Sequence, residues 1–276
     1  MLRLSRDRVV IALAPDALAL VLVEGSARRR IAANRVLRYE PALGADSWQA
    51  ATVALRDVAA ELKDVKADVT VVLSNHFVRY ALVPPSEGLD RGEEELAFAR
   101  YCFAKIHGAR SKSWDVRMSG AGDADRLASA IDATLLETVR ECFPPGGKLK
   151  LVSVQPYLMS AFNRWRATLQ LERAWFMLVE PERLCIGLLE NGRWTAVRNA
   201  KATLETPEQW AEVLDREQHL VACAEPPAGA YVHAPHTGHA GAPQVEGWSF
   251  NSLSLPSVEG LTVEEAAPLS MALCAA

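Results

Sequence analysis

The stretch VVIALAPDALALVLV, residues 9–23, consists of two apolar runs separated by Pro15-Asp16. Short runs rich in valine and isoleucine favour strands, and a Pro-Asp pair between them is typical of a tight turn. The stretch therefore predicts a buried β-hairpin. The residues that follow predict a third strand at 30–39 and a helix that begins at the capping residue Ser47.

The rest of the first half adds strands and helices in alternation. DVTVVLS, residues 68–74, predicts a β-branched strand. Apolar periodicity and turn residues predict the other elements. These are strands at 77–83, 114–118, 127–131 and 149–154, and helices at 93–106, at 134–142 and from Pro156 onward.

The second half repeats the order of three strands, a helix and a strand. LVEPERLCIGLLENGRW, residues 178–194, contains Asn191-Gly192, a strong signal for a tight hairpin. The expected elements are strands at 175–179, 184–189, 194–197 and 230–233, a helix at 207–222, an irregular stretch to about 247 and a terminal helix from Val263.

This repetition predicts an α/β fold with two repeated mixed sheets flanked by helices. We expect a first lobe at 1–170, with a small inserted subdomain at about 85–132. The second lobe is expected at 171–276.

The composition excludes several classes of protein. The 276 residues are 50% hydrophobic and 23% charged, which excludes a disordered chain and a polytopic membrane protein. A net charge of −4 argues against a nucleic-acid binder. The five cysteines are widely spaced and form no C-x-x-C pair, as in cytosolic proteins. The N-terminal apolar runs are too short to span a membrane. We therefore expect a cytoplasmic protein that reaches a membrane only through a partner.

Charge is distributed unevenly along the chain. Residues 1–38 carry eight basic and three acidic residues, whereas residues 201–276 carry two basic and ten acidic residues. Arg28, Arg29 and Arg30 form a basic cluster that suits an acidic partner segment or anionic lipid headgroups. A solvated turn beside an apolar strand is the simpler interpretation of this cluster.

The repeated order of elements resembles the actin-like (ribonuclease H-like) ATPase superfamily. Within it, the chain is similar to the PilM and cytoplasmic GspL families, which assemble type IV pili and type II secretion systems. The resemblance spans most of the chain. It rests on the hairpin at 10–23, a segment from Val71 that ends in VPP, residues 149–156 before a helix, the segment 178–194 and a final helix rich in alanine and leucine.

The resemblance implies a nucleotide site whose first motif has been lost. In nucleotide-binding relatives the first hairpin reads D-x-G-S/T-x-x-x-K, and its backbone and hydroxyl donors approach phosphate. Here Ala12 replaces the acid, Ala14 the glycine and Ala19 the lysine. Pro15 and Asp16 replace the small hydroxyl pair. Pro15 removes a donor, and Asp16 adds negative charge at the phosphate position.

The second phosphate hairpin has also departed from the pattern. Its acid position falls on Leu178, or on Glu180 if the alignment shifts by two, and Leu184 and Cys185 replace hydroxyl residues. A late glycine pair has no counterpart in residues 231–241. We therefore expect no enzyme activity, no catalytic residues and no cofactor. The alternative is an actin-like ATPase or kinase that retains nucleotide binding.

His233, His236 and His239 form a cluster of titratable residues with metal-binding chemistry. Three imidazoles suit Zn²⁺ or Ni²⁺. Their segment is broken by proline and glycine and contains no cysteine, so we favour a chance cluster without a metal.

The resemblance implies a scaffold that binds the cytoplasmic tail of an inner-membrane pilus or secretion subunit. An extended tail would bind by main-chain pairing and side-chain pockets. Residues 77–83, 93–106 and 114–118 are expected to line its groove. The candidate contacts are Phe77, Arg79, Tyr80, Tyr101 and Trp114. A homodimer and an unrelated α/β protein with another binding role stay open.

Overall fold

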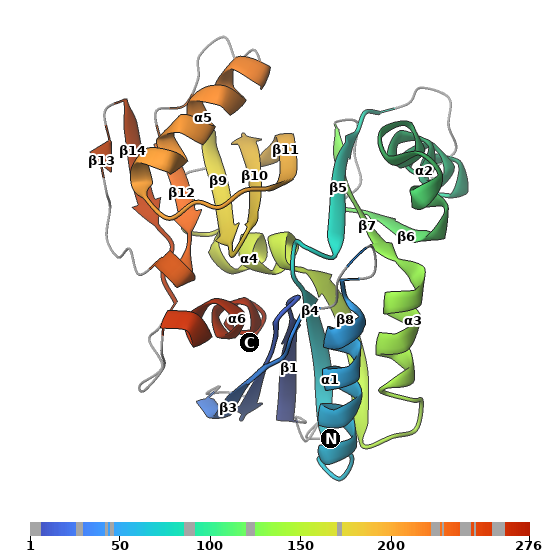
Figure 1. The fold of residues 1–276 in the computed structure, drawn as a ribbon. Helices are drawn as coiled ribbons and strands as arrows, with labels where there is room; N and C mark the ends of the chain where they lie inside the picture. The colour runs from blue at the N-terminus through green and yellow to red at the C-terminus, as the bar shows by residue number, and fades with distance from the viewer. Residues whose placement is uncertain are drawn as a thin grey trace. The chain divides into compact units, whose positions relative to one another are not determined.

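A computed structural model describes residues 7–25, 30–41, 44, 47–85, 92–119, 125–169, 173–221, 227, 229–237, 244–245, 247–255 and 263–276. The chain forms two units, each assembled from segments that are separate in the sequence (Figure 1). The first unit comprises residues 1–78, 131–164 and 265–276, and the second comprises residues 79–130 and 165–264. The expected boundary at 170 lies close to the change of unit at Trp165, whereas the last helix groups with the first unit.

The first unit is built on a five-stranded mixed sheet with the strand order β3-β2-β1-β4-β8. The first three strands are antiparallel neighbours, and β4 and β8 run parallel to β1. The strands are β1 (Asp7–Leu13), β2 (Ala17–Glu24), β3 (Arg30–Arg38), β4 (Ala67–Leu73) and β8 (Leu149–Pro156). The helices are α1 (Gln49–Glu61), α3 (Ala133–Glu141), α4 (Tyr157–Trp165) and α6 (Val263–Leu273).

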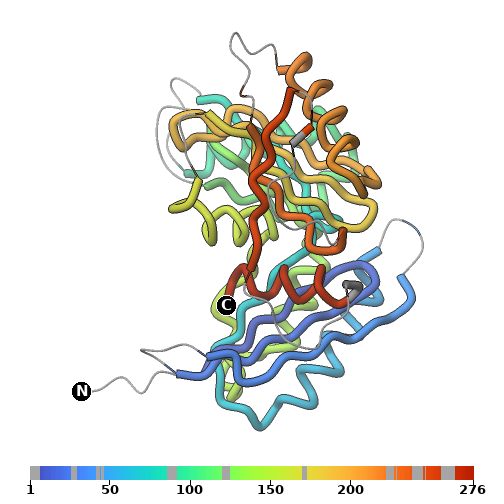
Figure 2. Tube along the Cα trace, turned by 90° about the vertical axis from the view of Figure 1, so that its left-hand side faces the viewer, coloured from blue at the N-terminus to red at the C-terminus, as the bar shows by residue number. Residues whose placement is uncertain are grey.

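Helices α1 and α6 cover opposite faces of this sheet (Figures 1 and 2). Arg35 of β3 pairs with Glu61 of α1 at 2.7 Å. On the other face, Arg8 of β1 donates to the carbonyl oxygen of Ala275, just after α6, at 2.9 Å. Side chains alternate between faces along a strand, so Ala12 shares the face of Arg8 and lies on the α6 side.

The start of α1 differs from the expectation. Trp48, not Ser47, is the N-cap residue, and no side chain caps the helix. The buried face is nevertheless the one that the periodicity predicted, because Ala51, Leu55 and Val58 are all buried. Packing of this apolar face, rather than capping, stabilises the helix.

The second unit contains a six-stranded sheet with the order β11-β10-β9-β12-β14-β13. Its strands are β9 (Arg173–Glu180), β10 (Arg183–Glu190), β11 (Arg193–Lys201), β12 (Gly229–His233), β13 (Gln244–Val245) and β14 (Trp248–Ser252). Helix α5 (Pro207–Val221) packs on one face, where Trp175, Trp210 and Phe250 are buried together. A short 3₁₀ turn, η2 (Pro235–Thr237), follows β12.

The predicted repeat is confirmed by the strand orders. In each unit three antiparallel strands lead through a helix to a strand that runs parallel to the first. Strand β14 was not predicted, although its alternation of buried Trp248 and Phe250 with exposed polar residues is a strand signal. The indole of Trp248 belongs to the core and donates to Asp215 of α5 at 2.8 Å.

A separate three-stranded sheet with the order β5-β7-β6 lies in the inserted part of the second unit. Its strands are β5 (Val78–Val83), β6 (Trp114–Met118) and β7 (Arg126–Asp132). Helix α2 (Glu93–His107) packs on it through Ala99 and Phe103 and leads into the 3₁₀ helix η1 (Gly108–Ser113). β5 is therefore an edge strand of this small sheet, and it does not extend the sheet that contains β4.

Candidate functional site

The turn between β1 and β2 contains the residues that the resemblance aligned with a phosphate-binding motif. The N–H of Ala14 donates to the carbonyl oxygen of Ala17 at 2.8 Å. Pro15 has no N–H. The carboxylate of Asp16 accepts from Arg38 Nη1 at 2.6 Å. Ala14 and Pro15 thus offer no free N–H to a ligand, and Asp16 carries a carboxylate.

Tyr39, the residue that follows β3, forms two hydrogen bonds to this turn. The hydroxyl of Tyr39 donates to the carbonyl oxygen of Ala14 at 2.7 Å, and its backbone N–H donates to the carbonyl oxygen of Asp16 at 3.1 Å. Burial, together with the negative charge of Asp16, raises the pKa of Tyr39 well above its usual range. The hydroxyl therefore keeps its proton and remains a donor. This role of Tyr39 was not predicted from the sequence.

The two alanines that replace the acid and the lysine lie inside the sheet. Ala12 and Ala19 are directly opposite each other on β1 and β2, and both are fully buried. Neither position presents a polar group to a metal ion or to phosphate.

The second hairpin, between β9 and β10, has an apolar interior. Leu178 and Cys185 are directly opposite each other, and both are fully buried. Burial raises the pKa of Cys185 well above its usual range, so its thiol stays protonated. Glu180 is 7% exposed and lies beside Arg183, whose pKa is lowered by burial and raised by this carboxylate.

The histidine cluster is divided between two environments. His233, at the end of β12, is buried, with Nδ1 2.6 Å from the carbonyl oxygen of Leu253. His236 lies in η2, and burial lowers its pKa. His239 lies outside the described residues. Within the part of the chain that the structure describes, no group of three or more His, Cys, Asp or Glu side chains could hold a metal ion.

Two of the expected partner residues, Arg79 and Trp114, act on His107 at the end of α2. The ring of Trp114 lies 5.0 Å from the ring of His107. Burial lowers the pKa of His107, and the charge of Arg79 on β5 lowers it further. This histidine was not selected from the sequence: it is the last residue of α2 and lies one residue beyond the helix predicted at 93–106.

The remaining expected contacts lie on several different elements. Phe77 is buried at 7% exposure, and Tyr80 follows on β5. Tyr101 is 57% exposed on α2, where it stacks on Phe98 and lies under the ammonium group of Lys105. Arg30 begins β3 in the first unit, and Arg28 and Arg29 lie outside the described residues.

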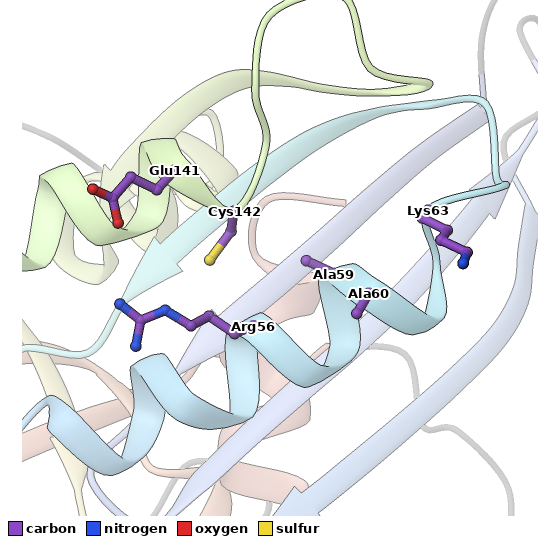
Figure 3. A pocket seen from close by; sticks show the side chains of 6 residues that line it. All are labelled: Arg56, Ala59, Ala60, Lys63, Glu141 and Cys142. Carbon is purple, nitrogen blue, oxygen red and sulfur yellow. The ribbon is translucent and has the colours of Figure 1, made fainter.

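A pocket of about 360 Å³ lies between α1 and the end of α3 in the first unit (Figure 3). Its lining residues are Arg56, Ala59, Ala60, Lys63, Glu141 and Cys142. Burial raises the pKa of Cys142, which therefore lacks the thiolate character of a catalytic cysteine. The pocket holds charged groups but no arrangement of nucleophile and base.

Among the described helices, none has the length and apolarity required to cross a membrane.

The architecture is similar to that of solved proteins with an actin-like ATPase fold. A protein of unknown function from Bacteroides thetaiotaomicron, solved with an actin-like ATPase fold, superimposes with a TM-score of 0.53 at 11% identity. The match covers 83% of this chain and 81% of that chain.

Two solved structures from secretion and pilus systems are also similar. The PilM–PilN type IV pilus biogenesis complex matches with a TM-score of 0.62 at 15% identity, over 97% of this chain and 96% of that chain. The cytoplasmic domain of EpsL, an inner-membrane component of the type II secretion system of Vibrio cholerae, matches with a TM-score of 0.58 at 12% identity, over 97% and 94%. No protein-family profile and no curated protein matches this sequence. At these identities the likeness establishes the fold.

Proposed function

We propose that this protein is a non-catalytic scaffold of a type IV pilus or type II secretion-like platform at the inner membrane. In this proposal its actin-like fold no longer uses nucleotide. It lies on the cytoplasmic side and is held at the membrane by the cytoplasmic tail of a membrane subunit. The likeness in fold to the EpsL domain and to the PilM–PilN complex supports this system.

The observation that carries the proposal is the chemistry of the β1–β2 turn. A phosphate-binding turn needs N–H groups that point at the ligand and a positive local potential. Here the N–H of Ala14 is already bonded and Asp16 places a carboxylate at the turn. Phosphate would have to approach this carboxylate and compete with it for Arg38, and both effects oppose binding.

We predict that the protein does not bind ATP or ADP. Calorimetric titration of the full chain with either nucleotide and Mg²⁺ is expected to show no saturable heat at micromolar concentrations, because the turn lacks donors for phosphate. Micromolar binding that is lost in Asp16→Ala or Glu180→Gln variants would support an ATPase or kinase and overturn the proposal.

The expected tail site lies on the β5-β7-β6 sheet. β5 is an outer strand of this sheet, so an extended tail can pair with its main chain. Arg79 supplies a positive charge that acts on His107, and Trp114 supplies an aromatic surface whose ring lies 5.0 Å from the same imidazole. This combination suits a tail that pairs along β5 and places one polar and one apolar side chain beside α2.

We predict that Arg79→Gln weakens tail binding by about tenfold, the effect of losing one charge-assisted hydrogen bond. The measurement is fluorescence anisotropy with labelled peptides that span the cytoplasmic tails of the inner-membrane pilus or secretion subunits of the same organism. The matched control is Arg193→Gln, which changes an exposed arginine of β11 in the same unit. No binding of any such tail by the unmodified protein would remove the proposed partner, and equal affinities of the two variants would remove the proposed site.

A further inference from the structure

Strand β3 is an edge strand whose outer side meets no other strand among the described residues. It is nine residues long and pairs only with β2. An edge of this length presents a row of N–H and C=O groups that another chain can extend, unless side chains or other elements block it.

The hydrogen-bond pattern identifies the groups that face outward. Opposite residues of an antiparallel pair alternate between bonded and non-bonded pairs. The N–H of Ala14 donates to the carbonyl oxygen of Ala17, so Ala17 turns its peptide groups toward β1. By the alternation along β2, Leu18 and Leu20 turn their peptide groups the other way, toward β3. Their partners on β3 are Leu37 and Arg35.

The residues of β3 that alternate with these partners therefore turn their peptide groups away from β2. Asn34 and Val36 direct their N–H and C=O groups to the outer edge of the sheet. The bond from the N–H of Tyr39 to the carbonyl oxygen of Asp16 follows the same alternation.

Among the described residues this edge is exposed, and its pairing with β2 keeps it extended. Residues 30–35 are exposed, and Ile31 is 39% exposed. The three arginines of the strand form exposed ion pairs: Arg30 with Glu24 at 3.2 Å, Arg35 with Glu61 at 2.7 Å and Arg38 with Asp16 at 2.6 Å. A partner strand would thus meet a template that is already extended, which lowers the entropic cost of pairing.

The charge of β3 selects the kind of partner. The strand carries three arginines and no acid, and Arg28 and Arg29 precede it in the sequence. Each guanidinium has five N–H donors, so an arginine bound to one carboxylate retains donors for a second. Exposed ion pairs of this kind contribute little by themselves and exchange readily.

A second copy of the chain is a poor partner for this edge. If the β3 strands of two copies paired, the arginines of both strands would lie close together, and neither strand has an acidic residue to pair with them. Like charges that face each other across strands are destabilising. Carboxylates of an acidic partner strand would instead attract the arginines of β3 and stabilise the pairing.

We propose that the outer edge of β3 binds an extended acidic segment of a partner polypeptide, which adds a sixth strand to the five-stranded sheet. Main-chain bonds to Asn34 and Val36 hold the segment, and the arginines select for carboxylates. This surface belongs to the first unit and is independent of the tail site proposed above.

The probe is a fluorescently labelled peptide of about eight residues that alternates glutamate and valine, a length that matches the strand. Fluorescence anisotropy is expected to show saturable binding that weakens as salt is raised. Asn34→Pro removes an outward N–H without removing a bond to β2, and it is expected to weaken binding by about tenfold. Asn34→Ala keeps the N–H and is the matched control, with unchanged affinity.

Several outcomes would overturn this proposal. They are the absence of saturable binding, equal affinities for Asn34→Pro and Asn34→Ala, and equal binding of a peptide that alternates lysine and valine. Dimerisation in analytical ultracentrifugation that Asn34→Pro abolishes would instead assign the edge to a second copy. Binding to phosphatidylserine vesicles without binding to the acidic peptide would assign it to lipid. An unchanged melting temperature of Asn34→Pro confirms that any loss of binding is local.

Discussion

Lowering the pH from about 7 to about 4 is expected to remove about 3 kcal/mol from the free energy of unfolding through one residue, His233. The side chain is 3% exposed, and its ring lies 4.6 Å from the ring of Trp165. Nδ1 is 2.6 Å from the carbonyl oxygen of Leu253, and because a carbonyl can only accept, Nδ1–H is the donor.

The direction of this effect follows from the protonation of the two states. Burial lowers the pKa of His233 from 6.5 to about 4, and the charge of His236 also lowers it, against the bond to Leu253, which raises it. As the pH falls through 6.5, the unfolded chain binds a proton that the folded chain does not bind until about pH 4. The contribution of His233 to stability is therefore complete above pH 6.5 and is lost progressively down to about pH 4.

The measurement is urea denaturation between these pH values, followed by tryptophan fluorescence. His233→Asn is the control, because its amide can donate to Leu253 but does not titrate in this range. The stability difference between the two proteins should change by about 3 kcal/mol across the range. Parallel pH profiles for the two proteins would contradict the prediction.

Gly187→Ala is expected to destabilise the second unit by about 2–3 kcal/mol, because β10 has no room for a methyl group at this position. A Cβ built on Gly187 would lie 2.4 Å from Cζ3 and 2.7 Å from Cε3 of Trp194, and 3.0 Å from the carbonyl oxygen of Ala196. The Trp194 indole is 7% exposed and meets the ring of Phe176 edge to face at 6.1 Å. It can move aside only by giving up this packing.

A double-mutant cycle tests this explanation. In a Trp194→Leu background the ring is gone, so Gly187→Ala should cost about 1 kcal/mol or less. Gly229→Ala is the matched control, since among the described residues a Cβ there meets only the carbonyl oxygen of Ser249, at an ordinary 3.7 Å. A cost for Gly187→Ala that is equal in both backgrounds would show that the indole is not the obstacle.

Most of the fold was predictable because its signals are local. The apolar run 9–14, the turn at Pro15-Asp16 and the pair Asn191-Gly192 each specify strands or turns through nearby residues, and the structure contains the corresponding hairpins. Strand β14 was missed because it is five residues long and follows an irregular stretch. Its pairing with β12 depends on residues that are distant in the sequence.

The candidate sites were predictable only in part. Residue types at Ala12, Ala14 and Asp16 are enough to predict that phosphate ligands are missing from the first hairpin. The bracing of that turn by Tyr39 was not predictable, because it depends on how β3 ends beside β2. His107 gave no signal for the same reason: its neighbours Arg79 and Trp114 come from different strands.

By itself the sequence determined the order of strands and helices, their repetition and the loss of phosphate-binding residue types, because periodicity, turn chemistry and residue identity are local properties. Only the tertiary structure decided which strand is the open edge of each sheet, that Gly187 lies under Trp194, and that His233 is buried beside Trp165. These features depend on contacts between residues that are far apart along the chain or that share a face only after the sheet has formed. The same holds for Arg30, Arg35 and Arg38: their number is visible in the sequence, but their presentation along the edge of a sheet results from the pairing of β3 with β2 and with no other described strand.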